Sequence, residues 1–256
     1  MEQEKKMVKL NVGCGIGLLA GFLNIDKYMD YDALVEGHRT KEGSYKDSII
    51  ELEPDGTPAK FLQADISDTK LPDAYADYVL LNNVLEHLPM AQLLPAIKEM
   101  KRVMKPGAEI CIICPDFNNL AELWTKAIAS QTGTFKNWDL FLYLAEVIYG
   151  NQAHEGEFHR SPITPDLLNY LFQLCGFEQI VVTCYPIHTA VPDYDGNRTA
   201  LDSVCRTDTL VARAKVPVTV SVELWEHIPA PEEIVVVPNE LCVNVSDGTK
   251  VKGGLR

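Results

Sequence analysis

Glycines and aspartates in the first quarter of the chain have the residue types of a nucleoside-binding site. Residues 10–17 read LNVGCGIG after a β-rich run, and Asp26 and Asp65 each follow a further short apolar run. Glycine lets the backbone adopt positive φ and approach a ligand closely. A carboxylate at the end of a second strand can accept both hydroxyls of an adenosine ribose, and one at the end of the third can address the adenine amino group. Either acid alone would suit a helix cap or a solvated turn, but together with the glycines they predict one ligand crevice.

The spacing between the glycines and the first acid restricts the ligand. Asp26 lies only 11 positions after Gly15, whereas nicotinamide enzymes place the ribose acid about 20 residues beyond their glycines. A helix within so short a crossover has a turn or two at most and presents little of a pyrophosphate cradle. A ligand without a diphosphate is therefore favoured.

A polar loop carries side chains that can activate a hydroxyl group. Residues 149–160 read YGNQAHEGEFHR, with His154 and His159 inside the loop, and His87 follows the fourth predicted strand. Histidine is the side chain whose ordinary pKa suits proton transfer near neutral pH. The alternative for His159 and Arg160 is that they only order the loop or cap the next helix.

Two other patterns look like metal or redox sites. Glu86 and His87 are adjacent and could bind a divalent metal together with a distant histidine, but we expect them to order the turn that follows and predict no metal. Cys111 and Cys114 resemble a chelating pair. Positions three apart on a strand point to opposite faces, so we expect buried thiols instead.

Strands and helices alternate along the chain and must position these residues. We predict strands at 8–12, 21–25, 60–64, 77–81, 109–114, 177–183 and 210–214. Predicted helices are 90–104 with Pro95 in its first turn, 117–130, 138–149, and one that begins at Pro165 after the N-cap Thr164 and ends at Gly176. Residues 28–60 are expected to form a long loop with one short helix. This order predicts an α/β fold with a mostly parallel sheet and helices on both faces.

The pattern of apolar and turn-forming residues changes after Val216. Residues 217–256 hold β-like runs separated by prolines and an Asp-Gly turn. We predict a small β-rich C-terminal appendage that could extend a sheet, cover the site or form a homodimer contact. Residues 1–216 are expected to form one domain, with a substrate-binding helical and loop insertion at about 117–165.

Composition restricts the partners and the compartment. The formal net charge is −13 and no cluster of basic residues is present, so nucleic acid is not an expected partner. No apolar run is long enough to span a bilayer, and residues 1–10 lack the apolar core of a secretory signal. The seven cysteines are an odd number and lie mostly in apolar segments, as buried thiols of a reducing compartment do. We expect a cytoplasmic protein that binds a small molecule and no membrane.

Four segments in order resemble the class I S-adenosylmethionine-dependent methyltransferases, most closely the small-molecule, methyltransferase type 11-like branch. They read LNVGCG…GFLNID, LQADISD, DYVLLNNVLEHLP and MKPGAEICIICPD. The resemblance covers about residues 8–183 and implies a Rossmann-like, seven-stranded sheet with S-adenosylmethionine as cofactor. It does not specify the methyl acceptor.

The resemblance also implies roles for individual residues. Gly13, Cys14 and Gly15 would pack against the methionine part of the cofactor. Asp26 would hold the ribose, and Asp65 with Ile66 would frame the adenine. Asn82 and Asn83 would line the methionine and methyl face. Asn11 departs from the acidic residue that many relatives have there, so its contact with the cofactor amine would be a hydrogen bond without charge.

In the resembled branch, a loop of the type YG-x-Q…H-[KR] faces the substrate. This implies His159 as general base or substrate anchor, with His154 second, and an acceptor site that includes His87, Tyr149, Gln152 and Arg160. We therefore predict O-methylation of a small hydroxylated molecule such as a sugar, a nucleotide-linked sugar or a natural-product intermediate, by in-line transfer. Transfer to nitrogen or to a phosphate-type oxygen is left open. The alternatives are a cofactor-binding partner or regulator without turnover and, less favoured, a nicotinamide oxidoreductase.

Overall fold

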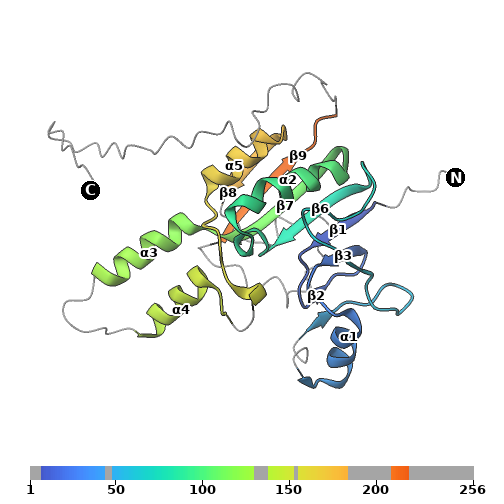
Figure 1. Cartoon of the computed structure of the whole chain (residues 1–256), viewed down its shortest axis with the longest axis horizontal. Helices are drawn as coiled ribbons and strands as arrows, with labels where there is room; N and C mark the ends of the chain where they lie inside the picture. Colours follow the sequence, from blue (N-terminus) through green and yellow to red (C-terminus); the bar gives the residue numbers. More distant parts are fainter. Residues whose placement is uncertain (1–6, 44–47, 130–137, 153–154, 184–208, 219–256) are drawn as a thin grey trace. The chain divides into compact units, whose positions relative to one another are not determined.

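The computed structural model describes residues 7–43, 48–129, 138–152, 155–183 and 209–218, without the side chains of residues 123, 126–129 and 138–143. Seven strands of this part form one sheet in the order β5-β3-β1-β6-β7-β9-β8. All pairs from β5 to β7 are parallel, and β9 runs antiparallel to both β7 and β8. The predicted α/β fold with a mostly parallel, seven-stranded sheet is confirmed (Figure 1).

The strands agree with the predicted runs to within a few residues at each end. In sheet order they are β5 (Phe61–Gln63), β3 (Phe22–Asp26), β1 (Lys9–Val12), β6 (Ala76–Asn82), β7 (Met104–Pro115), β9 (Thr209–Lys215) and β8 (Glu178–Thr183). Val12 at the end of β1 pairs with Ile25 of β3 and with Leu81 of β6. The residues that follow these three strands are therefore neighbours at the carboxyl edge of the sheet.

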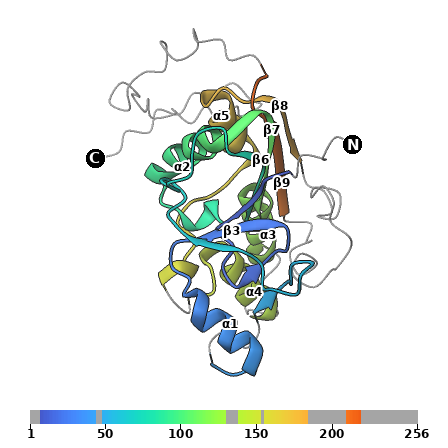
Figure 2. The ribbon, with the colours of Figure 1, turned by 90° about the vertical axis from the view of Figure 1, so that its right-hand side faces the viewer.

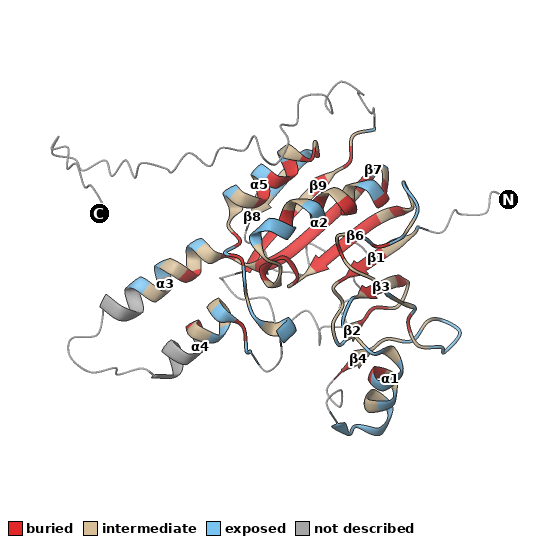
Figure 3. Ribbon diagram, in the orientation of Figure 1, coloured by how far each residue is buried: buried red, intermediate tan, exposed pale blue. Residues whose placement is uncertain are grey.

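The main core lies between one face of the sheet and two helices, α2 (Met90–Val103) and α5 (Pro165–Leu174). The two helices lie on the same side of the strands (Figure 2). Ile97 and Met100 of α2 and Phe172 of α5 are fully buried, while the other side of α2 is exposed or half-buried (Figure 3). Thr164 caps α5 by accepting a hydrogen bond from the Leu167 amide, as predicted.

A second, smaller cluster covers part of the opposite face of the sheet. Its residues come from β3, β6, β7 and β9 and from the connection before β3: Leu19, Phe22, Tyr78, Leu80, Cys111, Ile113 and Val211. Cys111 and Cys114 fall into different clusters, as the alternation of a strand requires. Both are buried free thiols, and their positions on opposite faces agree with the predicted geometry.

The connection from β1 to β3 differs from the expected short helix. It contains the two-residue strand β2 (Gly17–Leu18), which pairs with β4 (Ile49–Ile50), and the helix α1 (Tyr31–Thr40) comes only after β3. The buried Asn24 side chain holds this connection, because its Oδ1 accepts from the Leu19 amide and from Asn11 Nδ2, and its Nδ2 donates to the Leu19 carbonyl. Side-chain amides here satisfy backbone groups that a helix would otherwise satisfy internally.

Helix α2 and strand β7 also depart from the prediction in detail. Pro95 lies in the second turn of α2, because the helix begins at Met90 after Pro89. The segment Lys105-Pro106-Gly107 ends the helix but is already part of β7, where the pairing with β6 shifts register. A proline and a glycine suit such an irregular stretch of strand.

The segment after β7 lies beyond the carboxyl ends of β6 and β7 (Figure 1). It contains α3 (Phe117–Ala129), α4 (Trp138–Tyr149) and the short helix η3 (Glu155–Glu157). In the described part of the chain, no helix combines the length and the apolar character that a bilayer span needs. The predicted appendage at 217–256 lies outside the described residues, apart from its first two.

Candidate functional site

The glycine turn after β1 is tightly packed at Gly13 and open at Gly15. Gly13 and Gly15 both have positive φ, of 70° and 50°. A Cβ on Gly13 would lie 2.5 Å from Val84 Cγ2, whereas one on Gly15 would meet no heavy atom within 4 Å. The turn is thus packed against the residues after β6, and the backbone at Gly15 can be approached by a ligand.

Asp26 closes this turn from the end of β3. Its Oδ2 accepts from the Gly15 amide at 3.0 Å, and its Oδ1 accepts from the amides of Tyr28 and Met29 at 2.8 and 3.1 Å. A carboxylate offers about four lone-pair positions. Three are used within the chain, which leaves one for a ligand.

Asp65 and Ile66 follow β5 and have different environments. The Asp65 carboxylate forms an ion pair with Lys27 at 2.8 Å and accepts from the amide and hydroxyl of Ser67. Lys27 first, and then Ser67, hold the pKa of Asp65 at about 2, against the cost of partial burial. The Ile66 side chain belongs to the main core, so a ligand at this strand end would meet the backbone between the two residues.

Asn11 and Cys14 contribute to the internal structure of the turn. Asn11 is buried, and its Nδ2 donates to the Gly17 carbonyl and to Asn24 Oδ1. Burial first, and then the nearby Asp26 carboxylate, raise the pKa of the Cys14 thiol, which stays protonated at neutral pH. Both residues lie at the predicted place, but their polar atoms are directed mainly to the protein itself.

The end of β6 carries buried acceptors that the described part of the protein does not use. The side-chain Oδ1 atoms of Asn82 and Asn83 are both buried, and neither has a hydrogen-bond partner among the described residues. Asn83 has a φ of 53°, and its amide donates to the Ile113 carbonyl of β7, which fixes this bend. Unpartnered buried acceptors are costly, so this strand end is suited to a ligand that brings hydrogen-bond donors.

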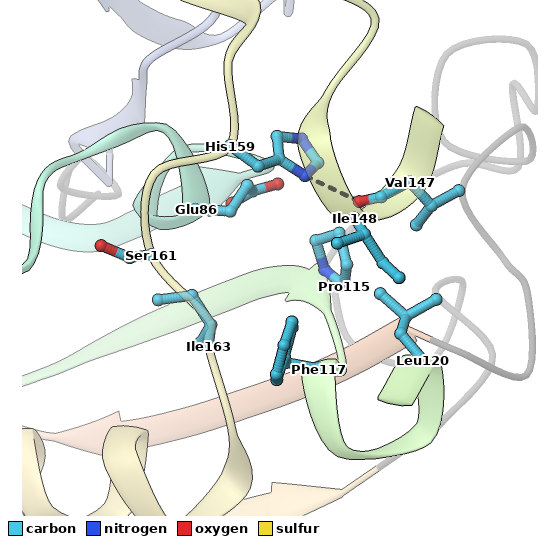
Figure 4. Close-up of a pocket in the computed structure, with 9 residues that line it drawn as sticks. All are labelled: Glu86, Pro115, Phe117, Leu120, Val147, Ile148, His159, Ser161 and Ile163. Carbon is cyan, nitrogen blue, oxygen red and sulfur yellow. Dashed lines mark hydrogen bonds between the residues drawn. The ribbon is translucent and has the colours of Figure 1, made fainter. Parts of the chain in front are cut away.

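A second site lies farther along the same edge, where the loop after α4 meets the residues after β6. A small pocket there, with room for about one water molecule, is lined by apolar side chains together with Glu86, His159 and Ser161. Figure 4 shows Glu86 and His159 on the same side of this pocket. The apolar lining residues are Pro115, Phe117, Leu120, Val147, Ile148 and Ile163.

Backbone hydrogen bonds hold the loop in this place. The amides of Arg160 and Ser161 both donate to the Glu86 carbonyl, at 2.6 and 3.1 Å, and the His159 amide donates to the Tyr149 carbonyl at 3.0 Å. Gly150, with a φ of 78°, allows the loop to close, because a Cβ there would lie 1.8 Å from the Glu157 carbonyl oxygen. The sequence prediction missed Gly150, although a glycine directly before a polar loop is a signal for such a close approach.

The titratable groups of this site are strongly affected by burial. Glu86 is 2% exposed, neither of its carboxylate oxygens has a hydrogen-bond partner among the described residues, and burial raises its pKa to about 8. Burial also lowers the pKa of His159 below its ordinary value. Both groups are therefore mainly uncharged at neutral pH. The sequence indicated Glu86 only as half of an adjacent pair, since nothing local shows that it is buried.

The two histidines contact each other, and their rings are oriented by carbonyl groups. The rings of His87 and His159 meet edge to face with centroids 4.7 Å apart. His159 Nδ1 donates to the Val147 carbonyl at 2.8 Å, and His87 Nδ1 donates to the Phe158 carbonyl at 3.3 Å. Because a carbonyl oxygen only accepts, each Nδ1 carries a hydrogen, so the lone pair of the neutral ring is on Nε2.

The other predicted acceptor residues lie on the rim. Tyr149 and Gln152 are exposed, and Gln152 donates to the Tyr149 carbonyl. Arg160 Nη2 lies 3.4 Å from a carboxylate oxygen of Glu155, in a partly exposed pair. His154 lies outside the described residues. The structure thus brings His159 and His87 together and leaves Tyr149, Gln152 and Arg160 at the surface around them.

Comparison with known proteins agrees with this arrangement. Residues 10–112 match a family model described as a methyltransferase domain. This segment of the chain is a methyltransferase domain. The matched segment runs from β1 into β7 and includes the glycine turn, Asp26, Asp65 and the end of β6, so the resemblance drawn from the sequence is confirmed.

Several solved structures of methyltransferases are similar to this chain. A SAM-dependent methyltransferase from Methanosarcina mazei is similar with a TM-score of 0.50 and 18% identity, over 85% of this chain and 95% of that one. One from Archaeoglobus fulgidus has a TM-score of 0.44 and 16% identity, over 83% and 87%. The 1,6-didemethyltoxoflavin-N1-methyltransferase of Burkholderia thailandensis has a TM-score of 0.44 and 13% identity, over 82% and 71%. No curated protein matches the chain.

Proposed function

We propose that this methyltransferase transfers the methyl group of S-adenosylmethionine to a hydroxyl oxygen of a small molecule, such as a sugar, a nucleotide-linked sugar or a natural-product intermediate. The observation that carries the proposal is the pair of buried amide oxygens of Asn82 and Asn83, which have no hydrogen-bond partner among the described residues. They lie at the end of β6, directly before Val84, which packs against the Gly13 turn. Such acceptors suit the ammonium group of the cofactor's methionine part.

The residues at the carboxyl edge fit the rest of the cofactor. The open backbone at Gly15 allows close approach, and the remaining lone pair of Asp26 can accept from a ribose hydroxyl. The backbone at Asp65 and Ile66 would meet the adenine. Cys14 and Asn11 shape the turn that carries these contacts. The sulfonium supplies an already activated methyl group, so the main task of the chain is to align the acceptor.

The acceptor would bind beside His159, under the helical and loop insertion at about 117–165. The Nε2 lone pair of His159 takes the proton of the acceptor hydroxyl as the methyl group is transferred. His87 supports the ring of His159, while Tyr149, Gln152 and Arg160 contact outer parts of the acceptor, with Arg160 the group for an anionic substituent. His154 is proposed as a second contact of the same loop.

The free thiols of Cys14, Cys111, Cys114 and Cys175 support a cytoplasmic location, because a reducing compartment keeps thiols in that state. We further propose one domain over residues 1–216 followed by a β-rich appendage, with a homodimer as a possible assembly through that appendage.

Calorimetry tests the cofactor. S-Adenosylmethionine and S-adenosylhomocysteine are expected to bind one per chain, and Asn83→Ala is expected to weaken both by about tenfold or more through the lost acceptor. NAD serves as the matched control and is expected not to bind. Binding of NAD without binding of the sulfonium would reverse the proposal in favour of an oxidoreductase.

Turnover with an identified acceptor tests the proton acceptor. His159→Gln is expected to lower kcat by about a hundredfold or more, with the KM for S-adenosylmethionine unchanged. The wild-type rate should rise with pH through a pKa below the ordinary histidine value and then level off, because burial lowers the pKa of His159. His38→Gln, on α1, is the control. A variant that keeps both the wild-type rate and its pH profile would remove His159 from the mechanism.

A further inference from the structure

We propose that Glu86, His87 and His159 bind one divalent transition-metal ion, with Zn²⁺ the best fit. The proposal goes beyond methyl transfer and does not require it. It departs from our expectation that Glu86 and His87 only order a turn. In the described part of the chain, one ligand atom from each of the three side chains lies within 4.8 Å of the other two.

The first argument is the state of the Glu86 carboxyl group. It is 2% exposed, and both oxygens lack a hydrogen-bond partner among the described residues. A buried carboxyl group without a donor is unfavourable in either protonation state. A cation at this point would supply the missing partner for the carboxylate.

The second argument is the orientation of the two imidazoles. Each donates its Nδ1 hydrogen to a backbone carbonyl, His159 to Val147 and His87 to Phe158. Histidines that bind metals nearly always donate their other ring nitrogen in this way, since the bond fixes the tautomer and the direction of the lone pair. The two rings contact each other, and a ring nitrogen of each lies close to a Glu86 oxygen; the proposal assigns the Nε2 atoms as the ligands.

The ligand types decide the kind of ion. Two imidazoles with one carboxylate are typical of zinc and related transition metals, whereas Mg²⁺ and Ca²⁺ prefer oxygen ligands alone. Zinc–ligand bonds of about 2.0–2.2 Å place neighbouring ligand atoms about 3.3 Å apart. The three ligand atoms lie within 4.8 Å of one another, so the side chains must move closer together when the ion binds.

The adjoining pocket suits the fourth ligand. Three protein ligands leave a tetrahedral ion one open position, and the pocket beside Glu86 and His159 has room for about one water molecule. A bound water, or an oxygen of the acceptor, would fill that position. The ion and a proton compete for the same lone pair on His159, so His159 cannot act as the general base while the ion is bound. In the metal-loaded protein, the ion would lower the pKa of a bound hydroxyl group and take over that role.

Metal titration of the full chain tests the site without cofactor or acceptor. After dialysis against EDTA, Co²⁺ is expected to bind one equivalent with the visible absorption of a four- or five-coordinate ion, and Zn²⁺ should displace it. Glu86→Gln, which keeps the shape of the side chain, and His87→Gln should each weaken Co²⁺ binding at least tenfold. His38→Gln is the matched control and should bind as the wild type does.

Several outcomes would overturn the proposal. They are no binding of Co²⁺, binding that survives in both Glu86→Gln and His87→Gln, or Mg²⁺ binding as tight as Co²⁺ binding. Circular dichroism shows whether each variant is folded, and Glu86→Gln removes a buried acid, so it is expected to fold. Because these measurements need no methyl transfer, failure of the metal site leaves the proposed activity standing, and the reverse also holds.

Discussion

Gly13 and Gly15 both have positive φ angles but different surroundings. We therefore expect Gly13 to matter for stability and Gly15 for ligand binding. At Gly13 a methyl group would overlap Val84, while at Gly15 it would point into open space. The glycine motif that indicated a ligand site therefore has two roles. One glycine allows the sheet to close against the end of β6, and the other leaves the backbone accessible to the ligand.

Gly13→Ala is expected to destabilise the protein by about 2–4 kcal/mol, from overpacking added to the strain of a positive φ. Gly15→Ala adds only the strain, about 1 kcal/mol, but weakens binding of S-adenosylhomocysteine. Urea unfolding measures the first effect and calorimetry the second. Equal losses of stability in the two variants would contradict the assignment.

Between the elements, Glu99 connects helix α2 to the segment that precedes β6. Its Oε1 accepts from the amide and hydroxyl of Thr69 at 2.8 and 2.7 Å, and its Oε2 accepts from Arg102 at 2.7 Å. Arg102 first, and then Thr69, hold the pKa of Glu99 at about 2, against the cost of burial. The side chain is only 9% exposed, so solvent screens these bonds little.

Glu99→Gln is therefore expected to cost about 2–3 kcal/mol of unfolding free energy at pH 7. The folded-state pKa lies below the ordinary 4.5, so this stabilisation is present above pH 4.5 and is lost as the pH falls toward 2. Urea unfolding at pH 7 and at pH 3 should show the difference between wild type and variant shrinking at the lower pH. Asp73→Asn, at the exposed partner of the same Arg102, is the control and should change stability by less than about 0.5 kcal/mol.

Elements with local signals could be predicted from the sequence, and elements made by distant contacts could not. Thr164 before Pro165 marks the start of α5 because the cap and the proline act within one turn. The ribbon of β2 and β4 had no such signal, since it depends on Gly17 meeting Ile49 across α1. We expected a short helix in this connection. The hydrogen bonds of the buried Asn24 amide, which hold the connection instead, leave no periodic pattern in the sequence.

The same distinction applies to the candidate site. The strand-end residues Asp26, Asp65 and Asn83 follow from the alternation of strands and connections, and the structure places them at one edge. The meeting of Glu86 with His159 depends on two amides of the loop donating to the Glu86 carbonyl. Such a contact between residues more than 70 positions apart is a tertiary feature. The sequence indicated only that Glu86 and His87 could pair with some distant histidine and that the loop is rich in polar groups.

For the molecule as a whole, the order of the sheet decides which parts respond to a ligand. The strands whose ends carry the cofactor residues, β3, β1 and β6, are adjacent, whereas β9 and β8 lie beyond β7 at the other side. A ligand that contacts three neighbouring strand ends opposes any local opening that separates them. A local opening that separates only β8 and β9 leaves the site intact. The bound ligand therefore does not raise the free energy of that opening.

Hydrogen exchange with saturating S-adenosylhomocysteine is expected to reflect this division. At a ligand concentration of 100 times Kd, the amides at the ends of β1, β3 and β6 should gain up to about 2.7 kcal/mol of protection, with little change in β8. NAD at the same concentration should protect neither region. Protection confined to β8 and β9 would place the ligand away from the carboxyl edge, because an opening is suppressed only where it destroys the binding site.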